Sequence, residues 1–313
     1  MNLAQVVLQL LAMGVEDPQH FDYLSPPSPA ALVRALETLF ALGCVAEGTK
    51  NGNISSIADN SNKSSSGSSS SSSASKPHPI ITPHGRQVAS LPLDPTYAHF
   101  VLRASELGCL SEALTSVSML SAENVLYMPS PHGGSDAAEQ RSKAVAAHRR
   151  LAAWDGDVPT LVNIYEMWLK AGKDKRKQWC KDQFVNARAV EKAQEVREQL
   201  VVLVTRLGLD ATQTCGSEKQ LFIRCLAASL FLNIAKRQPA SAATQGKGCY
   251  KTLASGKEVV IHPSSVLHGR NPPPACVVYT EVLTTSRAYI RGVTIADAVA
   301  LQEMMPQFFK QQG

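Results

Sequence analysis

The sequence lacks the motifs on which nucleotide hydrolysis and the commonest covalent chemistries depend. Its 313 residues contain no G-x-x-x-x-G-K-[ST] loop, and neither Ser255–Lys257 nor Gly246–Gly248 has the spacing and the following hydroxyl that would cradle a triphosphate. It has no D-E-x-H-like acidic element for magnesium, no G-x-S-x-G elbow and no pair of histidines four residues apart. We therefore expect no catalytic residue, no cofactor and no metal in this chain.

Paired cysteines and long apolar runs are also missing. The seven cysteines never form a C-x-x-C pair, which excludes a zinc site of the usual spacing and indicates reduced thiols in a nuclear or cytosolic protein. No run approaches the roughly 18–20 apolar residues of a membrane helix. The first residues have no basic segment and no small-residue cleavage site, so we expect neither a signal peptide nor a membrane partner.

Charge is distributed unevenly along the chain. Residues 1–169 contain 10 Lys and Arg against 15 Asp and Glu, whereas residues 170–313 contain 21 against 11. The second part is therefore the candidate surface for a polyanion such as nucleic acid. Lysines that only solvate helix faces would give the same excess, so composition alone does not decide between the two interpretations.

Three segments with different patterns predict a multidomain α+β protein. Residues 1–90 contain two short helices, a turn and a strand-like piece, which is typical of a small winged-helix unit. The serine tract at 50–79 has no apolar anchor, and we expect a disordered insertion there. Residues 91–215 predict a helical bundle that includes one long helix at about 179–207. Residues 216–313 begin with a helix and continue in short β-branched and aromatic runs, which predict a small OB-fold β-barrel.

The basic last segment contains the strongest candidates for binding. Arginine neutralises phosphates, hydroxyls set the register of a bound strand, and histidine and tyrosine rings stack on bases. Such side chains gather along the predicted strands and their loops: His262, Ser264, Ser265, Arg287, Tyr289 and Arg291. The alternative is that Tyr279 and Tyr289 are barrel core and that His262 is a loop residue with an internal partner. In the helical segment, polar groups near helix starts can face a channel: Asn163, Asn186 and Arg188.

Four phrases follow one another along the chain: FDYLSPPSPAALVRALETLFALGCV, ITPHGRQVASLPLDPTYAHFVL, GDVPTLVNIYEMW and VVIHPSSVLHGRNPPPACVVYTEVLTTSRAYIRGVTI. Their wording and order resemble the C-terminal region of the DEAH-box (DEAH/RHA-type) RNA helicases, over nearly the whole chain. That region has a winged helix, then a helical ratchet-like domain, then an OB-fold. The phrase ACVVYTE resembles the wording found in the subgroup of these helicases that acts in ribosome production.

The resemblance implies an ATP-dependent 3′-to-5′ RNA helicase or ribonucleoprotein remodeller. In that family two RecA-like domains hydrolyse ATP with Mg²⁺, and the ratchet and OB domains close a channel over single-stranded RNA. The implied RNA contacts in the OB-fold are His262, Ser264, Ser265, Thr284, Arg287 and Arg291, and those in the helical domain are Asn163, Asn186 and Arg188. The resemblance further implies a surface on residues 1–45 for a glycine-rich activator protein. It also implies a location in the nucleus or nucleolus, with the cytoplasm as the alternative.

Two departures from the family pattern shape the expected function. The RecA-like motor domains would precede Met1, so we expect this chain to be the RNA-binding end without its motor, a fragment or a truncated gene model. The family's usual Gly-Asp-His is Gly156–Val158 here, so any role of that histidine is absent. The alternative function is a non-catalytic protein-interaction scaffold derived from such a helicase, which the serine tract and the acidic first part favour.

Overall fold

The structure is a computed structural model that describes residues 3–48, 78–130, 136–239, 248–285 and 287–304. The chain divides into two compact units, residues 1–99 and 100–313, and each is described by itself. Apart from His78 and Pro79, the serine-rich insertion expected at 50–79 lies outside the described residues.

The first unit contains short helices and one pair of strands. Its elements are α1 (Leu3–Ala12), α2 (Pro29–Ala41), β1 (Val45–Gly48), β2 (His78–Ile81) and α3 (Pro83–Ala89), and α4 (Pro95–Glu106) begins within it. β1 and β2 pair antiparallel, with Val45 opposite Ile81. The Thr82 side chain caps α3 by accepting the Gly85 N–H, and a proline follows at the first helical position. The winged-helix assignment of this unit stays a prediction.

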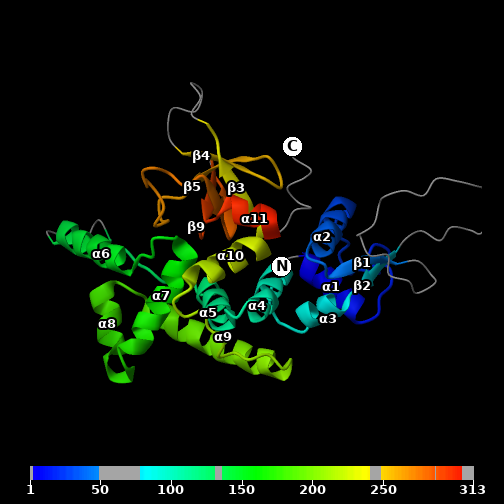
Figure 1. Cartoon of the computed structure of the whole chain (residues 1–313), viewed down its shortest axis with the longest axis horizontal. Helices are drawn as coiled ribbons and strands as arrows, with labels where there is room; N and C mark the ends of the chain where they lie inside the picture. The colour runs from blue at the N-terminus through cyan, green and yellow to red at the C-terminus, as the bar shows by residue number, and fades with distance from the viewer. Residues whose placement is uncertain (1–2, 49–77, 131–135, 240–247, 286, 305–313) are drawn as a thin grey trace, which may run out of the picture. The chain divides into compact units, whose positions relative to one another are not determined.

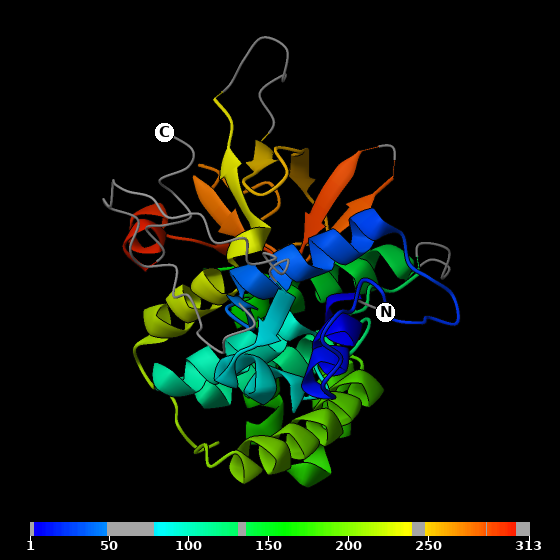
Figure 2. The same ribbon diagram turned by 90° about the vertical axis from the view of Figure 1, so that its right-hand side faces the viewer.

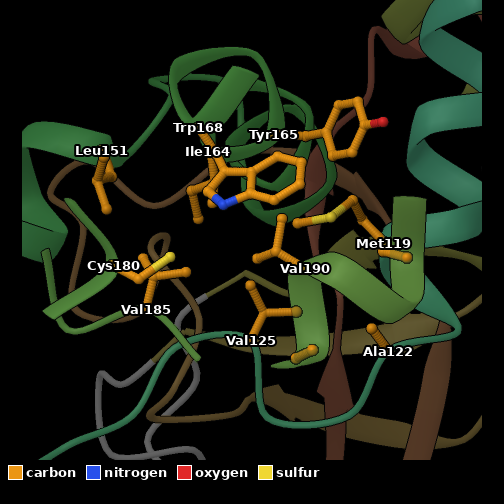
Figure 3. Packing of buried hydrophobic residues seen from close by; sticks show 12 residues of the cluster. Met119, Ala122, Val125, Leu151, Ile164, Tyr165, Trp168, Cys180, Val185 and Val190 are labelled. Atoms are coloured by element: carbon orange, nitrogen blue, oxygen red, sulfur yellow. The ribbon is translucent and has the colours of Figure 1, made fainter. Parts of the chain in front are cut away.

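Within the second unit, helices form one layer and strands another, and α10 lies between them (Figures 1 and 2). After α4 the helices are α5 (Leu110–Leu120), α6 (Ala137–Leu151), α7 (Asp157–Lys170), α8 (Arg176–Gln183), α9 (Ala187–Arg206) and α10 (Lys219–Ser229). Their core surrounds the Trp168 indole, against which Figure 3 shows Met119, Ile164 and Val190. Burial of such large apolar side chains is the main source of stability. None of the described helices is both long and apolar enough to cross a membrane.

The long helix expected at 179–207 is in fact two helices. α8 ends where Phe184 adopts a left-handed backbone conformation with φ 54°, and the Asn186 side chain caps α9 by accepting the Ala189 N–H. The Asn186 N–H itself donates to the Val125 carbonyl at 2.8 Å. This tertiary hydrogen bond replaces one that a continuous helix would make. The spacing of apolar residues carries no information about it.

The strands form one sheet of mixed pairing. They are β3 (Ile234–Arg237), β4 (Cys249–Thr252), β5 (Glu258–Ile261), β6 (Cys276–Val278), β7 (Glu281–Thr284), β8 (Ala288–Arg291) and β9 (Thr294–Ile295), and α11 (Ala298–Met304) follows. The order is β7-β8-β5-β4-β3-β6-β9, in which only β5 and β8 run parallel. The expected β-barrel is not closed, since no ladder joins β7 to β9 in the described part of the chain. The outer edge of β9 is covered instead by a bridge between Thr294 and Gly156.

A set of hydrogen bonds, called the Asp157 joint below, attaches the start of α7 to two loops of the sheet. The Asp157 carboxylate accepts hydrogen bonds from Ser265 Oγ at 3.0 Å, the Val266 N–H at 2.8 Å and the Val293 N–H at 2.7 Å. The Asp157 N–H donates in turn to the Val293 carbonyl at 2.7 Å. Burial raises the pKa of the Asp157 carboxyl, although these three donors and the charge of Arg291 act in the opposite direction.

The surroundings of Gly156 and Val158, on either side of Asp157, restrict which residue types fit at these two positions. Gly156 has φ 135°, and a Cβ there would lie 2.4 Å from the Val293 carbonyl oxygen, so only glycine permits this close approach. Val158, which stands where a histidine was expected, is fully buried. The Gly-Asp pair therefore serves the attachment of helix to sheet, and the third position serves the core.

Removal of the Asp157 carboxylate should destabilise the second unit. Asp157→Ala leaves three donors without an acceptor, so we expect the free energy of unfolding to fall by about 3 kcal/mol or more. Asp157→Asn turns an amide N–H toward a donor and should cost about 1–3 kcal/mol. Urea unfolding measures both, with Asp174→Ala as the control at an exposed acidic residue. An Asp157→Ala variant as stable as the control would contradict the role given to the joint.

Candidate nucleic-acid interface

Strands β5, β8 and β7 present an outer face whose composition follows from their register. Arg291 of β8 lies opposite Glu281 of β7, and Tyr289 of β8 pairs with Val260 of β5. Ile290 is fully buried and points into the core. Because successive side chains of a strand point to opposite faces, Tyr289 and Arg291 point outward.

Tyr289 and Arg291 lie on this face, and Arg287 stands in the turn directly before β8; these three residues are called the arginine–tyrosine stripe below. Residues two apart on a strand are separated by about 7 Å. Arg287 is exposed, and Tyr289 and Arg291 are partly exposed. Cations on either side of an aromatic ring suit a single-stranded nucleic acid, because each cation neutralises a phosphate while a base stacks on the ring.

His262 lies beside the stripe, directly after β5. Its ring meets the Tyr289 ring edge to face, with 5.6 Å between the centroids, and its Nδ1 lies 2.7 Å from Ser264 Oγ. Burial lowers the pKa of His262, and the charges of Arg291 and His268 lower it further. The ring is therefore neutral at pH 7 and gains its positive charge only in more acidic solution.

An acidic side chain opposes the stripe. Glu281 Oε1 lies 3.1 Å from Arg291 Nη1, and both side chains are more than two-fifths exposed. An exposed ion pair of this kind stabilises the fold little. It does, however, engage one of the two arginines that would otherwise be free for a phosphate.

The other predicted contacts of the sheet differ in how accessible they are. Ser264 is exposed next to His262, and Thr284 is exposed at the end of β7, where its hydroxyl lies 3.1 Å from the Lys257 ammonium. Ser265 is buried, and its hydroxyl donates to Asp157 in the joint. A role for Ser265 in RNA binding stays a prediction, and its observed role is to hold the loop after β5.

The three polar residues predicted in the helical layer lie apart from the stripe. Asn163 of α7 donates from Nδ2 to the Leu151 carbonyl at 2.8 Å, Asn186 caps α9, and Arg188 is exposed in the first turn of α9. No hydrogen bond, ion pair or ring contact joins any of them to the stripe within the described ranges. Their contact with RNA stays a prediction.

Sequence reasoning left open where the two strand tyrosines point. Tyr279 is buried, as expected for a core residue, whereas Tyr289 lies on the outer face. The signal that separates them is the period of two in Arg287-Ala288-Tyr289-Ile290-Arg291, in which the polar residues alternate with apolar ones. Glu281 and Lys257 carried no such signal, because their place beside the stripe depends on strand pairing.

Two parts of the chain match known protein families. Residues 223–308 match the family described as the oligonucleotide/oligosaccharide-binding (OB)-fold, and residues 94–161 match the helicase associated domain (HA2), ratchet-like. The chain is 32% identical over 310 residues to the human protein named Probable ATP-dependent RNA helicase DHX35, which covers 99% of this chain and 37% of that protein. It is 32% identical over 321 residues to the Pre-mRNA-splicing factor ATP-dependent RNA helicase DEAH10 of Arabidopsis thaliana, covering 99% and 38%. It is 33% identical over 311 residues to human ATP-dependent RNA helicase DHX33, covering 99% and 37%.

The chain belongs to the DEAH-box RNA helicase family and corresponds to its C-terminal region. It spans 37–38% of the length of these three helicases. Like the family, it has an OB-fold preceded by a helicase associated domain.

Membership of the DEAH-box family implies ATP and Mg²⁺ as ligands of the helicase. The residues of this chain do not fit a site for either ligand. The sequence contains no phosphate-binding loop, and the described residues contain no group of three or more His, Cys, Asp or Glu side chains that could hold a metal ion.

Proposed function

We propose that this chain is the RNA-gripping end of a DEAH-box RNA helicase or ribonucleoprotein remodeller. In this proposal residues 1–90 form a winged helix, residues 91–215 a ratchet-like domain and residues 216–313 an OB-fold. The outer face of β5, β8 and β7 binds single-stranded RNA. Motor domains elsewhere in the longer protein hydrolyse ATP, and this chain holds the strand.

The arginine–tyrosine stripe carries the proposal. Arg291 follows the partly exposed Tyr289 at strand spacing, Arg287 stands in the turn before β8, and His262 contacts the Tyr289 ring. The fold is one that binds oligonucleotides. Backbone contacts of this kind neutralise phosphates without reading sequence, which suits a helicase that travels along RNA.

Partners and location follow from family membership and are proposed with it. One matched relative is named a pre-mRNA-splicing factor, which supports a nuclear ribonucleoprotein as the substrate. The resemblance to the ribosome-production subgroup supports the nucleolus as a second location. Residues 1–45 are the proposed surface for a glycine-rich activator protein.

Loss of both stripe arginines should weaken RNA binding and its dependence on salt. For Arg287→Ala/Arg291→Ala we expect roughly a tenfold loss of affinity for a fluorescent single-stranded RNA. If each arginine neutralises one phosphate, the slope of log K against log salt should fall by about 1.4. Fluorescence anisotropy over a salt series measures both quantities.

The matched control removes two exposed arginines from other elements. Arg34→Ala/Arg206→Ala, on α2 and at the end of α9, lowers the net charge equally and should leave the affinity within about twofold of wild type. Equal losses in the two double variants would mean that net charge alone attracts the RNA. Absence of binding at low salt in the wild-type chain would favour the scaffold function instead.

Neutralising Glu281 should strengthen RNA binding. Glu281→Gln releases Arg291 from its ion pair and removes a carboxylate that repels phosphate. We expect the affinity to rise about two- to fivefold, which corresponds to about 0.5–1 kcal/mol for one exposed pair. The same anisotropy titration measures the effect, and Glu195→Gln, at an exposed residue of α9, is its control. Unchanged affinity in Glu281→Gln would place the RNA away from Arg291.

RNA binding should strengthen as the solution becomes acidic. The pKa of His262 is lowered from 6.5 in the free protein, so the ring is neutral at pH 7.5 and becomes charged as the pH falls through that lowered pKa. A phosphate nearby favours the charged form, so we expect affinity to rise about two- to fivefold between pH 7.5 and 5.5. His262→Ala should remove most of this rise, whereas His20→Ala, at an exposed histidine of the first unit, should preserve it.

A further inference from the structure

A pocket in the helical layer has chemistry opposite to that of the stripe. It has a volume of about 270 Å³ and lies among α5, α7, the start of α10 and the loop before α7. Its apolar lining includes the buried Phe222 and Ile223. Trp154 also lines it, and that side chain is 76% exposed, unusual for a tryptophan.

The chain itself demonstrates what Trp154 can bind. The Arg270 guanidinium stacks on the Trp154 ring at 3.8 Å from its centroid, and Arg270 Nη1 donates to the Trp154 carbonyl at 2.8 Å. A cation on an indole ring is held by the electrons of the ring face. The exposed part of the same indole remains available at the pocket.

The polar lining is acidic and rich in acceptors. It contains three carboxylates, of Glu112, Asp155 and Glu166, against the single ammonium of Lys219, so its formal charge is −2. Glu112 is engaged, because its oxygens accept from the Thr214 hydroxyl and the Cys215 N–H.

Two acceptors of the pocket are free. Glu166 is exposed and makes no hydrogen bond or ion pair with any described residue. Asn163 uses its Nδ2 for the Leu151 carbonyl, which leaves its Oδ1 as a further acceptor. The pocket thus offers an aromatic face and unpaired acceptors but few donors.

We propose that this pocket binds an arginine side chain of a partner protein. A guanidinium is flat, always charged and carries five N–H donors with no acceptor, which complements a tryptophan face and free carboxylate oxygens. A nucleotide is the less suitable occupant, because its phosphate would meet the excess of negative charge. The site goes beyond the proposed RNA grip, since it lies on helices and would recruit a protein.

Fluorine NMR of the full chain labelled with 5-fluorotryptophan tests the proposal. Trp154→Phe assigns the resonance of Trp154, and the resonances of Trp168 and Trp179 are internal controls. N-acetyl-arginine amide should shift the Trp154 resonance saturably, whereas the uncharged N-acetyl-citrulline amide should not. Glu166→Gln should weaken the arginine ligand about two- to fivefold, and Glu195→Gln should leave its affinity unchanged.

Three results would overturn the proposal. They are no saturable shift with the arginine amide, equal affinity in Glu166→Gln and wild type, and a saturable shift with AMP, GMP or UMP that exceeds the one with arginine. The last would make the pocket a nucleotide site. Thermal melts of each variant ensure that a lost signal reflects the pocket and not unfolding. Anisotropy with single-stranded RNA should be unchanged in Glu166→Gln, so failure here is distinguishable from failure of the RNA grip.

Discussion

The Asp157 carboxylate is the constraint on which the geometry of the outer face depends. It binds Ser265 and Val266, which follow His262 by three and four residues, and Val293, which follows Arg291 by two. One side chain at the start of a helix therefore fixes the loops that leave β5 and β8. Three donors offset part of the desolvation of this largely enclosed carboxylate, and without them the charge would be costlier still. The stripe and His262 are thus positioned from the helical layer as well as from their own strands.

The same joint explains how an open sheet keeps an ordered edge. β9 is only two residues long, and its outer side would expose unpaired backbone groups. The bridge from Gly156 to Thr294 and the hydrogen bond from the Ile295 N–H to the Asp155 carbonyl satisfy them. Helix and sheet therefore share backbone hydrogen bonds as well as side-chain contacts. A closed barrel is not needed to protect this edge.

Local signals in the sequence predict the helices and strands well, but they predict the contacts between them poorly. Thr82 and the proline after it are readable in the sequence as a helix start, and the alternation of polar and apolar residues up to Arg291 is readable as a strand with one outward face. The break between α8 and α9 and the engagement of Ser265 by Asp157 were not readable from the sequence. Asn186 donates to Val125, 61 residues away, and Ser265 donates to Asp157, 108 residues away. Ser265 was predicted to contact RNA because a serine hydroxyl can donate a hydrogen bond to a phosphate as well as to a carboxylate. Position in the fold, and not residue type, decides between those roles.

Opposite charges on the two layers separate their ligands. The stripe presents cations on a strand face, where a flexible polyanion can lie along it, and Glu281 is the nearest opposing charge. The pocket of Trp154 presents free acceptors on helices, where a guanidinium fits and a phosphate is repelled. Both sites connect to the Asp157 joint, because Asp155 lines the pocket two residues before Asp157 while Ser265 and Val293 support the stripe. An occupant of the pocket would therefore bind next to the residues that fix the RNA-facing loops, which gives a protein partner a direct physical route to the proposed grip on RNA.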